Sequence, residues 1–243
     1  MCTVITAIGL SSQWPILIAA VRDEATNRAW ASPARHWPEY PDLLGGLDLV
    51  GGGTWLAVDQ KACTAAFLVN RQGTKSSIVP RQSRGILPLQ VLSSDSQWHA
   101  KDLAPFDGFI LGKADSSGIS IWEWDTHSLA HQKLSKGVSG ICFRGVGAEH
   151  PRLQRHVPRF AAAPLPNPQC KEASSQAWGS WLHLFTDDET SPKDEATLLW
   201  TRIVNGCIWS SQSASCIAIG HNAIRFDFSD APDCIDSWIP IIS

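Results

Sequence analysis

Short apolar segments of strand length, separated by polar turns, are the feature that most limits how this sequence can fold. In the first third, residues 1–8 and 15–21 are such segments, and 55–58 is joined to 62–69 by a short polar connection. Apolar runs of four to eight residues bounded by turn signals are typical of buried strands, whereas helices need longer stretches. The first third therefore predicts strands, and residues 55–69 predict a hairpin.

The rest of the chain alternates predicted strands with predicted helices. Apolar and polar residues alternate over 119–124, which favours a strand, whereas prolines and a Gly-Gly pair within 25–50 predict an irregular surface segment. The other predicted strands are 108–112, 137–143, 197–200, 207–209, 214–219 and 223–228. The predicted helices are 83–94, 95–103, 151–160 and 172–185.

This order of elements favours a layered α+β domain with antiparallel sheets and helices outside. The chain has 243 residues, of which 44% are hydrophobic and twelve are Trp, so it can bury a sizeable core. The proline-rich segment 164–168 is the clearest break in the sequence. The 75 residues beyond it would make only a thin domain, so we expect a loop there and a single domain over 1–243.

Charge and cysteine content argue against several classes of protein. The net charge is −3 and no run of five basic residues occurs, so no nucleic acid or anionic membrane surface is implied as a partner. The seven cysteines are scattered without a C-x-x-C pair, which is typical of reduced residues rather than of disulfides or a zinc site. No signal-peptide pattern and no apolar run of 18 residues occur. We therefore expect a cytoplasmic protein without stable membrane insertion.

Cys2 is the strongest candidate for a catalytic residue. Because the second residue is small, an aminopeptidase can remove Met1. Cys2 would then carry a thiol and a free α-amine on one residue. A terminal amine has a pKa of roughly 7.7 to 8.0, so it can act as the base for the adjacent thiol near neutral pH.

Polar residues follow two of the predicted buried strands. Three charged residues, 22–24, end the strand that begins at 15, and Asn70 ends the second strand of the hairpin. Charges at the end of a buried strand indicate either a functional site or a solvated strand end that leads into a turn. The glycines at 51–53 can let a backbone approach a ligand closely, but no nucleotide-binding pattern follows them.

Several short motifs occur in the order in which the NRDE family has them, and together they cover most of the chain. This family is also called the transport and Golgi organisation family. Several spaced motifs in one order are far more specific than any one of them, so the sequence resembles a member of this family. The matching segments are MCT at 1–3, AAVRDE at 19–24, LD at 47–48, GGTWL at 52–56, AAFLVNR at 65–71, FDGFIL at 106–111 and GVS at 137–139.

The resemblance implies a fold and an activity. The implied fold is that of N-terminal nucleophile hydrolases, a four-layer αββα sandwich with two antiparallel sheets between layers of helices. The implied kin are cysteine acylases that cleave non-peptide C–N amide bonds, such as choloylglycine hydrolases and penicillin V acylases. The expected partner is then a small-molecule amide, and neither a cofactor nor a metal is expected.

The same resemblance implies roles for individual residues. Cys2 would be nucleophile and base, Arg22 and Asp23 would orient its thiolate and amine, and Asn70 would donate to the oxyanion. A cation beside a thiol lowers the pKa of the thiol, and one preorganised amide donor is worth about 2.7 to 4 kcal/mol at a developing oxyanion. The residues expected to contact the substrate are Glu24, Trp55 and Arg71.

The chain departs from the family pattern at four places. Val21 stands at the first position of the Asn-Arg-Asp-Glu signature, and Gly140 replaces an Asn that corresponds to a second catalytic amide of the acylases. Residues 150–153 replace a Pro-Trp-Pro-Lys-like stretch, and Gln212 stands where a late Gly-Thr-Arg-Ser-Ser segment has its Arg. Losing polar groups from a site usually costs orders of magnitude in rate, so these changes weaken the expectation of hydrolysis.

Two functions of different classes therefore remain open. The first is a cysteine amidohydrolase-like enzyme that acts through the terminal thiol. The second is a non-catalytic carrier on the same scaffold, for which the resemblance implies haem or lipid trafficking, with His150, His156 and His221 as candidate haem ligands. His127 and His131 have i, i+4 spacing, but they lie in a stretch that predicts strand and turn, so they do not predict a metal site.

Overall fold

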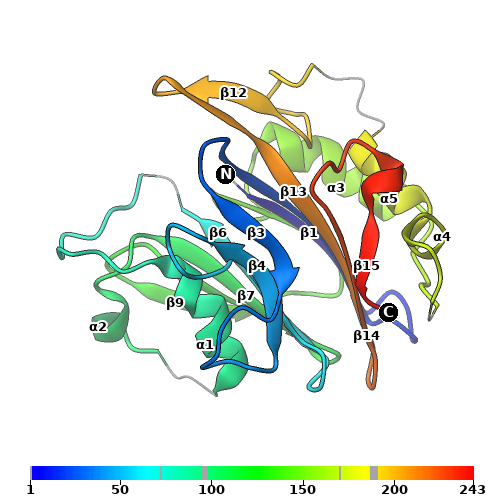
Figure 1. The fold of residues 1–243 in the computed structure, drawn as a ribbon, viewed down its shortest axis with the longest axis horizontal. Coiled ribbons are helices and arrows are strands. Elements are labelled where there is room, and N and C mark those ends of the chain that lie inside the picture. The colour runs from blue at the N-terminus through cyan, green and yellow to red at the C-terminus, as the bar shows by residue number, and fades with distance from the viewer. Residues whose placement is uncertain (1, 72, 95–97, 170, 187–190) are drawn as a thin grey trace.

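The computed structural model describes residues 2–71, 73–94, 98–169, 171–186 and 191–243. Within these ranges the strands form two sheets, and every strand pairing within them is antiparallel. Figure 1 shows the two sheets stacked, with helices on both outer sides. The predicted mixed class with two antiparallel sheets is therefore confirmed.

Sheet A is built from both ends of the chain. Its strands are β1 (Thr3–Ile8), β2 (Ile16–Ala25), β10 (Gly137–Cys142), β11 (Gly145–Val146), β12 (Thr201–Val204), β13 (Cys207–Ile219), β14 (Ile224–Ser229) and β15 (Ile239–Ile242). Their order is β11-β10-β1-β2-β13-β14-β15, and β12 pairs with β13. Thr3, the first residue of β1, pairs with Val21 of β2. The charged residues 22–24, which follow Val21, therefore lie beside the start of β1.

Sheet B takes its strands in chain order from the middle of the sequence. They are β3 (Trp30–Ala34), β4 (Leu43–Asp48), β5 (Leu56–Asp59), β6 (Thr64–Asn70), β7 (Phe109–Asp115), β8 (Gly118–Trp124) and β9 (Leu129–Lys133). The predicted hairpin of 55–69 is confirmed as β5 and β6, which pair from Leu56 with Phe67 to Asp59 with Thr64.

The helices are short and lie outside the sheets. They are α1 (Leu87–Ser93), α2 (Ala100–Leu103), α3 (Pro151–Ala162), α4 (Ser174–Trp178) and α5 (Ser180–Thr186), with 3₁₀ helices η1 (Arg84–Ile86) and η2 (Ile235–Ser237). In Figure 1, α3, α4 and α5 lie beside sheet A, whereas α1 and α2 lie beside sheet B. Pro88 lies in the first turn of α1, where the missing N–H costs no helical hydrogen bond.

Alternation along the strands places apolar side chains on both faces of each sheet. In β1, Val4 and Ile8 face the other sheet, whereas Ile5 and Ala7 face the helices. The inner faces of both sheets share one core, which includes Phe67 of β6. Fully burying a large apolar side chain contributes about 1.5–3 kcal/mol. The core between the two sheets and the cores between each sheet and its helices therefore hold the layers together. The helix residues in the outer cores are Phe160, Ala177, Trp178, Trp181, Leu182 and Phe185 on sheet A, and Leu87, Val91 and Leu103 on sheet B.

The prediction that residues 25–50 are irregular was wrong, because this segment contains the edge strand β3 and its neighbour β4, which pairs with both β3 and β5. Pro33 lies in β3 at the sheet edge, where a missing ladder donor is tolerated, and the pairing with β4 shifts register beside it. Gly45 lies against the Leu56 backbone, and a Cβ on Gly46 would overlap the Trp55 ring. These glycines therefore mark close approach within a strand rather than a turn.

Three predictions near the C-terminal end were also wrong in their boundaries. The predicted helix over 172–185 is two helices, because Gly179 between them has a φ of +50°. The strand predicted at 197–200 begins instead at Thr201. Strands 207–209 and 214–219 are one long strand, β13, with a bulge between Ser211 and Ser213.

Candidate active site

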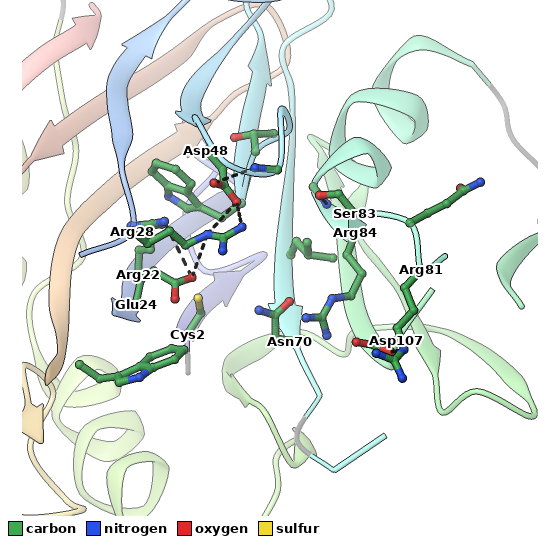
Figure 2. Close-up of a pocket in the computed structure, with 17 residues that line it drawn as sticks. Cys2, Arg22, Glu24, Arg28, Asp48, Asn70, Arg81, Ser83, Arg84 and Asp107 are labelled. Atoms are coloured by element: carbon green, nitrogen blue, oxygen red, sulfur yellow. Dashed lines mark hydrogen bonds and ion pairs between the residues drawn. The ribbon is translucent and has the colours of Figure 1, made fainter. Parts of the chain in front are cut away.

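A pocket of about 440 Å³ lies where the N-terminal start of β1 and the C-terminal ends of β2, β4 and β6 meet. One wall comes from sheet A, and the opposite wall comes from sheet B and the segment 81–85 (Figure 2). Five of the seven site residues predicted from the sequence line it, although they are spread over residues 2 to 70. They are Cys2, Arg22, Glu24, Trp55 and Asn70.

Cys2 directly precedes β1 and is partly exposed to the pocket. Its side chain packs against the core between the sheets, as the alternation with Val4 requires. Burial raises the pKa of the Cys2 thiol, and the charge of Asp23 raises it further, while the Asp23 backbone N–H and Arg22 oppose this. The thiol therefore holds its proton at neutral pH and needs a base before it can act as a nucleophile.

Arg22 is the most buried charged residue of the pocket, with 4% of its surface exposed. Its guanidinium carbon lies 4.2 Å from the centre of the Trp55 ring and 5.7 Å from that of Trp30. Burial lowers the pKa of Arg22, but an arginine stays protonated at neutral pH. The aromatic rings thus hold a permanent positive charge beside Cys2.

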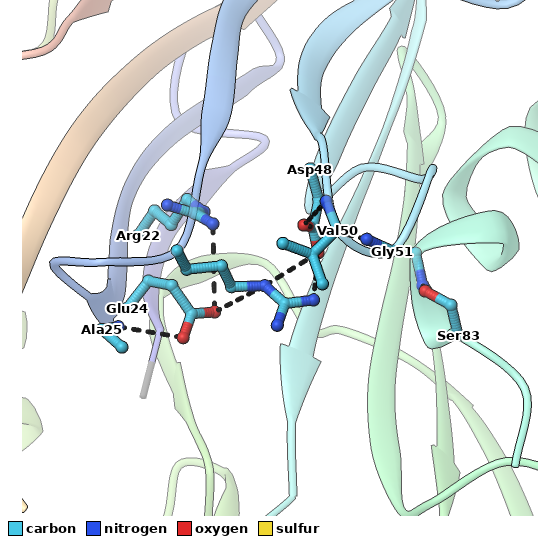
Figure 3. Close-up of polar contacts among 9 residues, drawn as sticks. Arg22, Glu24, Ala25, Asp48, Val50, Gly51 and Ser83 are labelled. Carbon is cyan, nitrogen blue, oxygen red and sulfur yellow. Dashed lines mark hydrogen bonds and ion pairs between the residues drawn. The ribbon is translucent and has the colours of Figure 1, made fainter. Parts of the chain in front are cut away.

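A chain of alternating charges joins β2 to the end of β4 (Figure 3). Glu24 Oε2 lies 3.9 Å from both Arg22 Nη2 and Arg28 Nε, and Glu24 Oε1 accepts a hydrogen bond of 2.9 Å from the Ala25 amide. Arg28 donates to Asp48 Oδ2 from Nη2 at 2.7 Å and from Nε at 3.1 Å. These contacts tie the two sheets together at the pocket.

Asp48 also shapes the glycine-rich turn at 51–53. Its Oδ1 accepts hydrogen bonds from the amides of Val50 and Gly51, at 3.0 and 3.1 Å. Partial burial opposes ionisation, but the bonds from Arg28 and these amides lower the pKa of Asp48. A Cβ on Gly53 would overlap the backbone of Gly85, so the glycine here permits close approach to η1 rather than to a ligand.

The wall opposite Cys2 carries Asn70, Arg81, Arg84 and Asp107 (Figure 2). Asn70 ends β6 and is exposed. Arg81 Nε lies 3.1 Å from Asp107 Oδ1, and Arg84 Nη1 donates to the Gly108 carbonyl at 2.8 Å. Neither arginine was predicted as a site residue, because in the sequence both look like solvated residues of a polar loop.

Asp23 faces away from the pocket, on the helix side of sheet A. Its Oδ2 accepts a 2.7 Å bond from Arg152 Nη1, and its Oδ1 accepts a 2.6 Å bond from Ser211 Oγ. Arg152 Nη1 also donates to Thr3 Oγ1 at 2.7 Å. Asp23 therefore reaches Cys2 through its backbone N–H and its charge rather than by lining the pocket.

Arg71, the other predicted residue outside the pocket lining, points toward sheet B. Its Nη1 lies 3.9 Å from Glu123 Oε2 on β8. Neighbouring strand residues point to opposite faces, so Arg71 and Asn70 diverge where β6 ends.

Three residues that depart from the family pattern lie outside the pocket lining. Val21 belongs to the core beneath the helices. A Cβ on Gly140 would lie 2.7 Å from Val157 Cγ2 and 2.8 Å from Leu153 Cδ2, so this position faces α3. Gln212 lies at the bulge of β13 and donates to Ser210 Oγ. These substitutions therefore do not remove a side chain from the pocket of this chain.

The histidines considered as ligands lie apart. His150 Nδ1 accepts the Arg152 amide at 3.2 Å and caps α3, and His156 Nε2 lies 2.9 Å from the Ala196 carbonyl oxygen. His131 stacks on Trp122 with ring centres 4.7 Å apart. His127 lies in the turn before β9, and His221 is exposed. Among the described residues, no group of three potential ligands could hold a metal ion.

The His150 cap predicts a pH dependence of stability. Burial lowers the pKa of His150, and the charges of Arg152 and Arg144 lower it further. In the unfolded chain His150 takes up a proton below about pH 6.5, whereas in the folded chain it resists one. Stability should therefore fall as the pH drops below 6.5, by no more than about 1.4 kcal/mol per pH unit from this residue.

Urea denaturation between pH 5 and pH 7.5 measures this effect. His150→Asn keeps a capping side chain without a titrating group, so its stability should depend less on pH. His221→Asn, at an exposed position, is the matched control. Equal pH slopes for His150→Asn and the natural chain would contradict the assignment.

No helix in the described part of the chain has the length and apolar character needed to cross a bilayer.

Comparisons with known proteins identify the family. No curated protein sequence matches the chain. A family model described as "Transport and Golgi organisation 2" matches residues 1–218, which is most of the 243 residues. The chain therefore belongs to the transport and Golgi organisation 2 family, as its motifs indicated.

Proposed function

We propose that this protein is an N-terminal nucleophile cysteine hydrolase that cleaves a C–N amide bond of a small molecule through Cys2. The observation that carries the proposal is the position of the Cys2 thiol, directly before β1 and in the lining of a pocket that also contains Arg22 and Asn70. Two stacked antiparallel sheets with helices outside agree with the αββα architecture of such enzymes. Met1 lies outside the described residues, and its removal remains part of the proposal.

Cys2 supplies both the nucleophile and the base in this mechanism. The sulfur attacks the amide carbonyl carbon while the thiol proton passes to the α-amine of the same residue. The C–N bond then breaks, and the ammonium returns the proton to the leaving nitrogen, which leaves a thioester on Cys2. Water attacks the thioester while the α-amine takes its proton, the C–S bond breaks, and the ammonium returns the proton to the sulfur, which restores the thiol. The net reaction converts an amide and water into an acid and an amine.

The raised pKa of Cys2 suits this mechanism. Burial keeps the thiol protonated, so a base must act in the same step as the attack. Arg22 stabilises the sulfur as negative charge develops on it, because the guanidinium is held beside Cys2 by Trp55 and Glu24. Asp23 acts as a positioning residue, since its backbone N–H bonds the sulfur and its carboxylate is fixed by Arg152 and Ser211.

The carrier alternative has weaker support. The pocket is lined by four arginines and three carboxylates, whereas haem and lipid chains bind between apolar walls. His150 and His156 already make hydrogen bonds within the fold. A haem titration followed at the Soret band tests this alternative. A saturable shift that His221→Ala abolishes would favour the carrier over the hydrolase.

Asn70 provides the kinetic test of the hydrolase. A chromogenic nitro-aromatic phenylacetamide that carries a carboxylate serves as the probe. Asn70→Ala should lower kcat by about 10²–10³-fold with a small change in KM, because an oxyanion donor acts mainly in the transition state. Asn222→Ala, at an exposed position far along the chain, is the control. Unchanged kcat in Asn70→Ala, or no hydrolysis of any amide in a broad panel, would contradict the proposal.

A further inference from the structure

The pocket contains more positively charged than negatively charged side chains. Three of its arginines lie close to a carboxylate, and the fourth, Arg84, has none within 4.0 Å among the described residues. The pocket therefore carries one surplus positive charge on the wall opposite Cys2. The three pairs are Arg28 with Asp48 at 2.7 Å, Arg81 with Asp107 at 3.1 Å and Arg22 with Glu24 at 3.9 Å.

Arg84 still has hydrogen-bond donors to offer. Its Nη1 donates to the Gly108 carbonyl at 2.8 Å, and this is the only hydrogen bond of its side chain within the described part of the chain. A guanidinium has five N–H groups in a rigid plane, so several remain for a ligand. Figure 2 shows the guanidinium beside Asn70 and toward the pocket. Burial lowers the pKa of Arg84, whereas Asp107 and, once ionised, Cys2 raise it. An arginine stays protonated at neutral pH, so Arg84 carries a positive charge within electrostatic reach of the Cys2 sulfur.

A second donor in the same pocket also lacks a partner. Arg22 is 4% exposed, and its Nη1 is buried without a hydrogen-bond partner among the described residues. A buried guanidinium N–H without an acceptor is costly, and an anion nearby relieves that cost electrostatically. The surplus charge and the unsatisfied donor both indicate a negatively charged ligand.

The backbone around Arg84 is fixed in place. The Thr54 amide donates to the Gly85 carbonyl at 2.8 Å, and Gly53 packs against Gly85 without room for a Cβ. Arg84 therefore stands on a segment held against the glycine-rich turn. Such preorganisation favours recognition of a planar anion by paired N–H donors.

We propose that the pocket binds its ligand through a carboxylate held by Arg84, so that the amide cleaved at Cys2 is one that carries a carboxylate, such as an N-acylated amino acid. A single surplus charge matches a monoanion better than a phosphate dianion. The volume of about 440 Å³ admits a small molecule of this kind. The identity of the cleaved bond rests on the proposed function, whereas the carboxylate site does not require catalysis.

Alkylation of Cys2 tests the site without a substrate. Iodoacetate and iodoacetamide both form a thioether with the thiolate and release iodide, but only iodoacetate carries a carboxylate. The ratio of their rate constants at Cys2 is measured by peptide mass mapping at low salt, in the folded protein and in the urea-unfolded protein. Folding should raise the ratio in favour of iodoacetate by about five- to thirtyfold.

Three variants assign the effect to Arg84. Arg84→Gln should return the ratio close to that of the unfolded protein, Arg84→Lys should keep most of the increase because it keeps the charge, and Arg35→Gln should leave the ratio unchanged. Arg35 is an exposed arginine outside the pocket and so is the matched control. Thermal melting confirms that each variant is folded.

The outcomes distinguish failure of the carboxylate site from failure of the proposed hydrolase. A ratio that is the same in Arg84→Gln as in the natural chain, or the same in folded and unfolded protein, would overturn the carboxylate site. Slower carboxymethylation in the presence of acetate supports a carboxylate, whereas protection by inorganic phosphate alone would replace it with a phosphate. A ratio that depends on Arg84 in a protein that hydrolyses no amide would keep the anion site and refute the hydrolase.

Discussion

Replacing Cys2 with alanine is expected to lower the rate of amide hydrolysis by about a thousandfold or more, because the sulfur is the only atom of the protein that bonds to the substrate carbon in the mechanism. Removal of a nucleophile leaves only the contribution of binding and of the oxyanion donor. Substrate affinity should change little, since Arg22, Asn70 and Arg84 remain on the pocket walls. The measurement is kcat and KM for the carboxylate-bearing phenylacetamide.

Two further variants make the Cys2 result specific. Cys234→Ala removes an exposed thiol elsewhere and should retain full activity. Cys2→Ser keeps a hydroxyl and the α-amine but should still lose most activity, because a hydroxyl is a weaker nucleophile than a thiol. Hydrolysis by Cys2→Ala at the rate of the natural chain would show that another residue carries the reaction.

Replacing Asp23 with alanine is expected to lower the free energy of unfolding by about 3–5 kcal/mol. The Asp23 side chain is fully buried, and it accepts from Arg152 and Ser211 at 2.7 and 2.6 Å. Its removal leaves the Arg152 guanidinium, which is 6% exposed, without its carboxylate. A buried charge without its partner loses the attraction that offset the cost of its desolvation. Urea denaturation measures the change.

Two comparisons separate this cost from a general effect of losing a carboxylate. Asp42→Ala breaks the exposed pair with Lys61, whose atoms lie 2.6 Å apart, and should leave the midpoint nearly unchanged. Asp23→Ala combined with Arg152→Met should be more stable than Asp23→Ala alone, because the unpaired charge is gone. A single variant as stable as the natural chain would contradict the buried network.

The central strands could be predicted because their apolar segments are self-contained. The runs at β2 and β6 have strand length and end abruptly in polar residues, which sets their boundaries from local chemistry alone. Strands β3 and β4 were missed because Pro33 and Gly45 look like turn residues, and only the strands that pair with them show otherwise. The local sequence does not show whether the neighbouring strand can accommodate a proline or a glycine at these positions.

The residues of the candidate site also fall into those that the sequence predicted and those that it did not. Cys2 was predicted from its thiol and α-amine, and Arg22 and Asn70 from their places at the ends of predicted strands together with the family resemblance; all three line one pocket. Arg84 was missed, since it follows a polar loop, and its position depends on the contact between Gly85 and Gly53 far away in the sequence. The outward direction of Asp23 depends on Arg152 of α3, which no local pattern indicates.

The most direct measurement is the mass of the protein after brief reaction with the p-nitrophenyl ester of phenylacetic acid, followed by peptide mapping. The expected product is a chain that begins at Cys2 and carries one phenylacetyl group on the Cys2 sulfur, formed in a burst of p-nitrophenolate and then lost by hydrolysis. Retention of Met1 together with an unmodified Cys2 would contradict the proposed mechanism.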